Sequence, residues 1–352
     1  MPMNPVYFKP TFLLIVFFLS VCDLKSQSLP RSDFQLELKD EPGPQKIDLP
    51  FSTIKVLDKR FDSSKLGYLF FRSSYKNITL KSSLSAAMEE VFRKNFLSSN
   101  NSDRTLCIVI RTLWMHDLKS GEVDVEDFNN EMKNISKYIL KADVYSFQNN
   151  TYQALTRIDT SFESKSSLKE IGYELLNNSF TYMAHRISSL NLEELFSRKT
   201  KINESDVMNY YEQRFKKPRI QHDTLSRGIY LTFADFLNNH PRPYKFSLQQ
   251  DEQSDYLYIE ENGQEKLFTD FWGFSDGENL YLRLGFNFFK LIRDNNTYSL
   301  WGCLQAVHTT PSRNKNRVVR YMAFGNLANI RSAKLNNVLR PMQLDMETGI
   351  AY

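Results

Sequence analysis

The stretch WGFSDGENLYLRLGFNF, Trp272–Phe288, carries two competing patterns. Its GFSDG core matches the G-x-S-x-G motif of serine hydrolases, in which a strand, a strained turn and a helix expose the nucleophilic serine. From Leu280 onward, however, apolar residues recur at every second position, which is typical of a strand with one buried face. The alternation therefore predicts two strands joined at an Asp276-Gly277 type I′ turn, the second running from Leu280 to Phe288.

Ser275 is the residue that a hydrolase would use as its nucleophile. A triad also needs a histidine and an acid in the right order. His308 is the one histidine downstream of Ser275, and the nearest suitable acid, Asp294, lies in the turn-like segment RDNNT. We therefore interpret the motif as a hairpin and keep a serine hydrolase using Ser275 as an alternative.

Residues 224–352 continue this pattern: short apolar segments are separated by turn dipeptides such as Asn262-Gly263. This pattern predicts an antiparallel β-meander domain with one short helix in YLTFADFLNN. Residues 201–223 are expected to form a helix, NESDVMNYYEQRF, capped by Asn203 or Ser205. The segment KKPRIQHD then breaks the helix at Pro218 and is expected to be a linker.

Residues 34–200 mix two kinds of periodicity. Helical spacing of apolar residues predicts helices at Ser83–Phe96 and in LKEIGYELLNNSFTYMAHRISSL. The apolar run Thr105–Met115 predicts a strand buried on both faces, and Lys141–Phe162 predicts two strands around Asn149-Asn150. The fold class expected for the whole chain is α+β, with an N-terminal mixed α/β layer domain followed by the C-terminal antiparallel β-meander domain.

Residues 1–28 predict a signal peptide. The apolar run Phe12–Cys22 ends at Asp23 and, as a helix, would reach roughly half of a ~30 Å hydrocarbon core. A secretory segment cut before Leu29 is the favoured interpretation, with lipidation of Cys22 as the alternative. The mature chain is then expected to be exported (periplasmic, outer-membrane-associated or secreted) and to have no transmembrane span.

The net charge and the cysteine content restrict which partners and which cysteine chemistry are expected. The net charge of +4 is spread along the 352 residues, so nucleic acid is not expected as a partner. Once the signal peptide is removed, Cys107 and Cys303 remain. Both lie in apolar segments and are predicted to be buried free thiols, with an interdomain disulfide between them as the alternative.

The spacing of the histidine, cysteine and glycine residues does not match the common metal-binding or cofactor-binding motifs. None of the five histidines forms an i, i+4 pair, no Cys-x-x-Cys is present, and no glycine-rich phosphate loop is found. The adjacent pairs His116-Asp117 and His222-Asp223 are expected to point in different directions. Acidic residues at Asp124, Glu126 and Asp127 are interpreted as the start of a helix. We therefore expect no metal and no cofactor.

Two features favour binding. The segment SRNKNRVVR contains Arg313, Lys315, Arg317 and Arg320, which form either a solvated loop or a contact for anionic glycans or lipid headgroups. The aromatic cluster around Trp272 is interpreted as core, with stacking on sugars as the alternative. A carbohydrate-binding envelope module therefore remains a further alternative.

The segments GIYLTFADFLNNHP, DFWGFSDGENLYL and LDMETGIAY resemble a group of uncharacterised exported proteins of Bacteroidetes-type bacteria. The resemblance covers about the last third of the chain and implies export, but no chemistry and no site residues. The sequence thus leads us to expect an exported, non-catalytic cell-envelope protein that acts as a structural or interaction module. Its partner would be an unidentified protein or glycan of the envelope.

Overall fold

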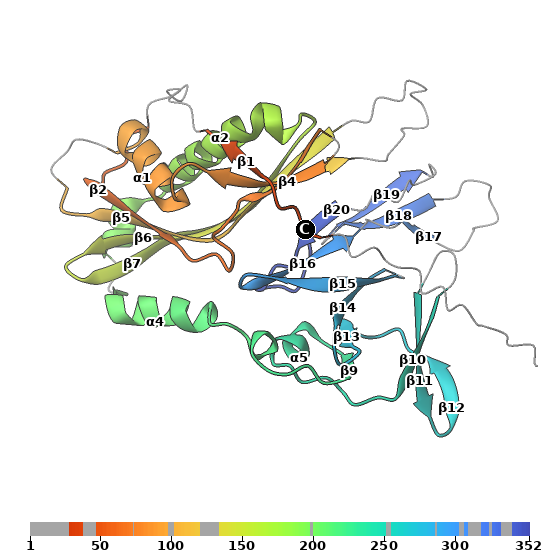
Figure 1. The fold of residues 1–352 in the computed structure, drawn as a ribbon. Helices are drawn as coiled ribbons and strands as arrows, with labels where there is room; N and C mark the ends of the chain where they lie inside the picture. Colours follow the sequence, from red (N-terminus) through yellow and green to blue (C-terminus); the bar gives the residue numbers. More distant parts are fainter. Residues whose placement is uncertain are drawn as a thin grey trace, which may run out of the picture.

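The computed structural model describes residues 28–37, 47–72, 74–97, 102–119, 134–197, 200–250, 255–285, 287–302, 306–308, 318–323, 326–331 and 340–352. The protein is α+β, as expected, with a mixed sheet in its N-terminal half and antiparallel sheets in its C-terminal half (Figure 1). Residues 1–27 of the predicted signal peptide, including Cys22, and the segment with Asp124, Glu126 and Asp127 lie outside the described residues.

The N-terminal half is built on one eight-stranded sheet. β5 is its centre, pairing in parallel with β2 and β3 and antiparallel with β6. No pattern in the sequence predicted β1, β3, β4 or β8. The strands are β1 (Asp33–Leu36), β2 (Thr53–Asp58), β3 (Gly67–Phe71), β4 (Ser74–Leu80), β5 (Thr105–Lys119), β6 (Asn134–Gln148), β7 (Thr151–Ser164) and β8 (Ile202–Asn203).

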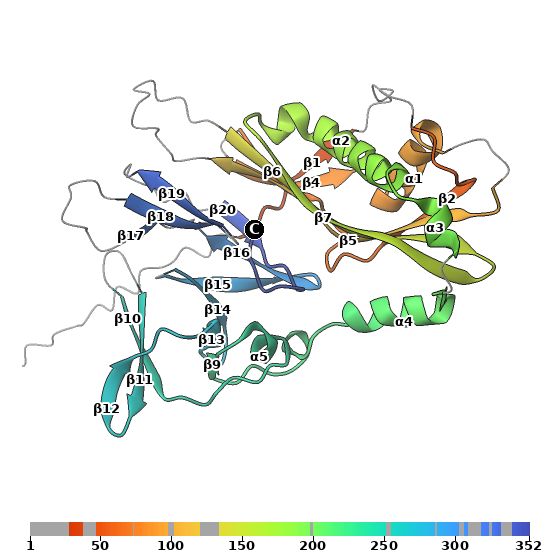
Figure 2. The ribbon, with the colours of Figure 1, turned by 180° about the vertical axis from the view of Figure 1, so that it is seen from behind.

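Two predicted helices cover one face of this sheet, α1 (Leu84–Asn95) and α2 (Leu168–Ser188) (Figures 1 and 2). The Ser83 hydroxyl caps α1 by accepting from the Ala86 N–H at 3.2 Å. A short helix that the sequence did not predict, α3 (Leu192–Ser197), follows α2. The layer on this side is an apolar core that holds the helices to the sheet.

The opposite face of the sheet is also covered. Helix α4 (Glu204–Arg214) packs Val207 and Tyr211 against β5, beside Cys107 and Val109 (Figure 2). Its N-cap is Asn203, one of the two predicted residues, although the Asn203 side chain makes no capping hydrogen bond. β5 is therefore buried on both faces, as its continuous apolar sequence predicts.

The described residues of the C-terminal half form three antiparallel sheets. A six-stranded sheet follows the order β20-β16-β15-β14-β13-β9, and β10–β12 and β17–β19 form two smaller sheets. The elements of this half are η1 (Arg219–Gln221), β9 (Gly228–Tyr230), α5 (Phe233–Leu237), β10 (Phe246–Gln250), β11 (Asp255–Glu261), β12 (Gln264–Leu267), β13 (Gly273–Ser275), β14 (Leu280–Leu284), β15 (Asn287–Asp294), β16 (Thr297–Gly302), β17 (Ala306–His308), β18 (Val318–Ala323), β19 (Asn326–Arg331) and β20 (Arg340–Gln343).

The predicted single strand from Leu280 to Phe288 is wrong. β14 ends at Leu284 and the chain reverses, so that Leu284 pairs with Asn287 of β15. Gly285 permits the reversal because it adopts a φ of 63°. The alternation of apolar residues continued across the turn and hid it.

The prediction of a type I′ turn at Asp276-Gly277 is also wrong. Ser275 pairs with Leu280, so residues 276–279 form a longer loop between the strands. The Asp276 carboxylate organises this loop by accepting from the N–H groups of Glu278 (2.8 Å) and Asn279 (2.7 Å). The strand–turn–strand arrangement itself is confirmed.

One buried face was predicted for this sheet, but both of its faces carry apolar cores. Leu280 and Leu282 face a core with Tyr298 and Leu300. Phe274 and Tyr281 lie on the other face, stacked with 4.7 Å between ring centroids. The second core is completed by β10 and β11, which pack over that face.

Candidate functional site

The two halves of the protein meet at a polar junction. The chain segment after β20, residues 344–352, forms a turn in which the Asp345 carbonyl accepts from the Gly349 N–H at 2.8 Å. Leu344 bridges back to Ala351, which closes the turn. This segment, hereafter the 344–352 turn, lies against the sheet of the N-terminal half and carries most of the charged contacts between the halves.

Arg111 of β5 lies at the centre of these contacts. Its side chain is only 1% exposed, with Nε 3.0 Å from Asp143 and Nη1 donating to Glu347 at 3.1 Å. The other oxygen of Glu347 accepts from Arg214 of α4 at 3.0 Å. Burial alone would raise the pKa of Glu347, but the two arginines lower it below its ordinary value, so the carboxylate is charged at neutral pH.

A second pair of contacts reinforces the first. Lys141 of β6 donates to Asp345 at 2.6 Å. Tyr211 of α4 donates to Asp143 at 2.7 Å and meets Tyr145 at 2.7 Å. The 344–352 turn is therefore tied to β5, β6 and α4 through carboxylates on both sides of the junction.

The most chemically suggestive group at the junction contains a serine, a tyrosine and a lysine. The Tyr68 hydroxyl lies 3.1 Å from Ser299 Oγ, and Ser299 donates to Asp294 at 2.8 Å. Lys65 pairs with the same Asp294 and with Asp62, the latter at 3.4 Å. Serine, tyrosine and lysine together can supply a nucleophile and a base in acyl transfer, so their protonation states decide what this group can do.

Those protonation states oppose catalysis. Burial alone would lower the pKa of Lys65, but its neighbours Tyr68, Asp294 and Asp62 raise it well above the ordinary value. Burial raises the pKa of Tyr68 to about 12. At neutral pH the lysine is charged and the tyrosine neutral, so neither can take a proton from Ser299. Both Tyr68 and Ser299 are buried, which leaves a substrate no access.

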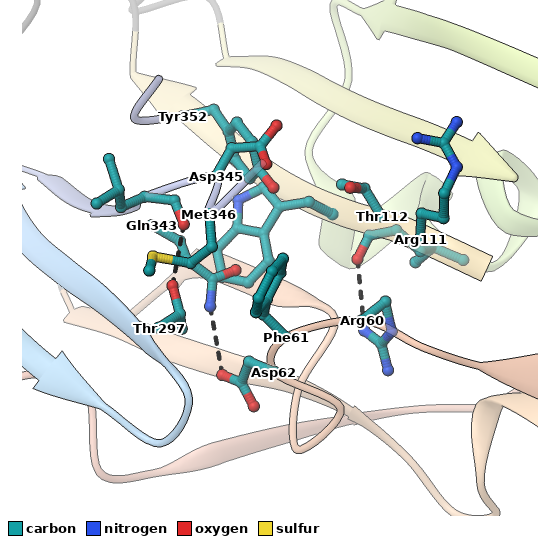
Figure 3. Close-up of a pocket in the computed structure, with 13 residues that line it drawn as sticks. Arg60, Phe61, Asp62, Arg111, Thr112, Thr297, Gln343, Asp345, Met346 and Tyr352 are labelled. Carbon is teal, nitrogen blue, oxygen red and sulfur yellow. Dashed lines mark hydrogen bonds between the residues drawn. The ribbon is translucent and has the colours of Figure 1, made fainter. Parts of the chain in front are cut away.

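A cavity of about 20 Å³ lies at the junction and is lined by Asp62, Arg111 and Asp345, among other side chains (Figure 3). Side chains from both halves line it. Gln343 of the C-terminal half donates to Asp62 of the N-terminal half at 3.3 Å, and Thr297 donates to the Leu344 carbonyl within the C-terminal half at 2.9 Å. The Trp114 Nε1 finds no acceptor within the part of the chain that the structure describes. The cavity has room for about one water molecule and is too small for an organic substrate.

Ser275, the predicted nucleophile of the hydrolase alternative, lies away from this junction in β13. Its side chain is fully buried, and its Oγ accepts from the Gly277 N–H at 3.1 Å. β14 follows where a nucleophile elbow has a helix. The geometry thus gives Ser275 a role in shaping the loop.

Trp272 is half-buried among other aromatic rings. Its ring centroid lies 4.5 Å from Phe236 and 5.3 Å from Phe233, and its Nε1 donates to the Gly349 carbonyl at 3.3 Å. The ring thus packs α5 against the 344–352 turn, which leaves little of its face for a sugar.

The basic segment cannot be placed as a group. Arg313, Lys315 and Arg317 lie outside the described residues. Arg320 lies in β18, where it pairs with Val307 and Asn329 of the neighbouring strands.

The other cysteine, aspartate and histidine residues considered from the sequence, where the structure describes them, lie in surroundings typical of a structural role. Cys107 is a buried free thiol, and burial raises its pKa to about 12, whereas Cys303 lies outside the described residues. Asp117 turns toward α2 and accepts from the Leu168 N–H at 2.9 Å. His116 is buried with a lowered pKa, caused first by burial and then by Arg340 and Lys137. Within the described ranges, no group of His, Cys, Asp and Glu is arranged to hold a metal ion.

The residues of the junction were not predicted from the sequence. Arg111 was visible as the one charge inside the apolar run of β5, an unusual place for an arginine without a partner. Asp345 and Glu347 were also visible, in LDMETG. Nothing in one sequence says that these segments meet.

Comparisons with known proteins add little. No family model matches the chain, and no curated protein matches it. A search of solved structures finds a protein from Xanthomonas campestris described under the family model DUF330, with 10% identity and a TM-score of 0.27. The match covers 44% of this chain and 92% of that one. A similarity at this level carries no argument about fold or function.

Proposed function

We propose that the protein is an exported, non-catalytic module of the cell envelope that binds a protein partner. The apolar segment Phe12–Cys22 supports export. In the part of the chain that the structure describes, no helix is long and apolar enough to cross a membrane. The polar groups of the junction support a structural role there, because they bond to each other across it.

The observation that carries the proposal is the small sheet β10–β12. Its inner face packs Phe246, Leu257 and Ile259 onto the six-stranded sheet. Its outer face carries Tyr258 directly opposite Leu267, and Leu267 is 44% exposed. Tyrosine is enriched at protein–protein interfaces relative to the rest of a protein surface. We call Tyr258 and Leu267 the outer patch.

The edges of this sheet favour contact through side chains. All residues of the edge strand β12 are exposed, and charged pairs lie across the sheet, Lys266 with Glu261 and Lys245 with Glu260. Charges on an edge strand oppose the addition of another strand. The partner is therefore a folded protein that covers the outer patch, not a peptide that extends the sheet.

The test is a photo-crosslinker placed at position 267 in the full-length protein in its native host. We expect a discrete adduct with one envelope protein, and we expect Tyr258→Asp to abolish it with the fold intact by circular dichroism. Ile202→Asp is the matched control, because Ile202 is 39% exposed but lies in β8 of the other half. An adduct that survives Tyr258→Asp, or no adduct, would contradict the proposal.

The hydrolase alternative is tested on the purified protein with a fluorophosphonate probe. We expect no covalent labelling. Labelling that disappears in Ser275→Ala or Ser299→Ala would replace the binding module with a serine hydrolase.

A further inference from the structure

The end of the N-terminal sheet farthest from the junction holds polar side chains where apolar ones are expected. Along β6 the face toward α1 and α2 is apolar at Val144 and then becomes polar at Ser146 and Gln148. Their partners on β7 are Gln153 and Thr151, in register. Ser146 and Gln153 are only 4% and 8% exposed, so polar groups have been buried at this end of the core.

Two cations adjoin these side chains. Arg104, just before β5, has its guanidinium carbon 3.8 Å from the centroid of the Phe196 ring. Phe196 is held in turn by Phe51, edge-on at 6.4 Å. Lys201 precedes β8 and completes the group. The stacked guanidinium is thus fixed in orientation before any ligand arrives.

The polar side chains and both cations line one small cavity of about 30 Å³. No acidic residue is among the described residues that line it. Neither Arg104 nor Lys201 makes an ion pair with a described carboxylate. Arg104 is half-buried and Lys201 is exposed, so two positive charges adjoin buried hydroxyl and amide groups where an anion can bind.

We propose that this cavity, the terminal pocket, binds a phosphate group. A charge of about +2 with no acidic residue lining the cavity matches a phosphate monoester, which carries about −1.5 to −2 at neutral pH. Arg104 and Lys201 would hold the charge, while the Ser146 hydroxyl and the Gln148 side-chain amide offer donors. The Gln153 amide already donates to the Leu195 carbonyl and shapes the wall of the cavity. The cavity has room for about two oxygen atoms, so the rest of the ligand stays outside. Free phosphate and a lipid headgroup present the same chemistry.

The experiment is a calorimetric titration of the full-length protein with inorganic phosphate, against potassium chloride at matched ionic strength. We expect saturable binding of phosphate and none of chloride. Arg104→Gln and Lys201→Gln should each weaken binding about tenfold, because each removes a charged hydrogen bond. Lys217→Gln is the control, since Lys217 is an exposed lysine outside the pocket. Lys201 is itself exposed, so its variant is expected to fold normally.

The results of these experiments either support or overturn the proposal. Absence of saturable phosphate binding, equal binding of chloride, or unchanged affinity in both pocket variants would overturn the proposal. Given phosphate binding, flotation with phosphatidylcholine vesicles assigns the source: retention only when phosphatidic acid is present, lost in Lys201→Gln, means a lipid headgroup, and no retention means free phosphate. The proposal does not rest on the outer patch, because the terminal pocket lies in the other half of the protein.

Discussion

Glu347 is the residue on which the junction depends most, because one carboxylate serves two arginines. In Glu347→Gln the charge of Arg111 stays buried, with Asp143 as its remaining ion-pair partner among the described residues. Removing one partner of a buried ion pair is costly, so we expect a loss of about 3 kcal/mol in the free energy of unfolding, measured by urea denaturation. Arg219→Gln is the control and should change this free energy by less than about 0.5 kcal/mol, because the Arg219–Asp223 pair is exposed.

The same carboxylate gives the stability a pH dependence with a definite sign. The folded-state pKa of Glu347 is lowered, so its contribution is fully present above the ordinary glutamate pKa of about 4.3 and is lost as the pH falls through the folded value. The stability difference between wild type and Glu347→Gln should therefore shrink in acid. Urea denaturation at pH 7 and at about pH 3 checks this, and a difference that grows in acid would contradict it.

The reactivity of the Cys107 thiol tests whether β5 is buried. Because its thiol is buried and its pKa is raised to about 12, it should resist iodoacetamide in the native protein at pH 8 and react once the protein is unfolded. Peptide mass mapping identifies the modified cysteine. Rapid native modification of Cys107 would show that β5 is not covered as described.

At the residue scale, the sequence predicted which side chains are buried better than it predicted which side chains contact each other. The sequence placed Cys107 in an apolar strand, and burial follows from that alone. The role of Arg111 could not follow, because its partners are distant in sequence and only the fold brings them together.

Among the elements, local signals predicted best. Asn262 and Gly263 form the predicted two-residue turn between β11 and β12, both with positive φ. The helices α1 and α2 also formed where apolar residues repeat at helical spacing. The reversal at Gly285 was missed because the alternation of leucine and phenylalanine did not change there.

Gly273, in β13, shows how closely two strands approach. A Cβ atom at this position would lie 2.4 Å from the Tyr281 carbonyl oxygen, which belongs to the backbone of β14. We expect Gly273→Ala to cost more than about 2 kcal/mol of unfolding free energy, because one strand must move. Ser275→Ala in the same strand removes one hydrogen bond and should cost about 1 kcal/mol. Equal effects of the two substitutions in urea denaturation would contradict this account of the strand pair.

For the whole molecule, composition and periodicity were enough to predict an α+β chain with a β-rich C-terminal half. They could not predict that β10–β12 and β17–β19 form separate sheets, because strand partners depend on long-range packing. Nor could they predict the junction, where buried charges, rather than an apolar interface alone, connect the two halves. We infer that these charges make the two halves unfold as one cooperative unit.

Native-state hydrogen exchange tests that claim most directly, using peptides from β6 in the N-terminal half and β16 in the C-terminal half. We predict that the most protected amides of both strands exchange with the same free energy of opening, and that Glu347→Gln lowers both by about 3 kcal/mol. The account would be contradicted if β16 opened at a much lower free energy than β6, or if Glu347→Gln changed the exchange of only one of them.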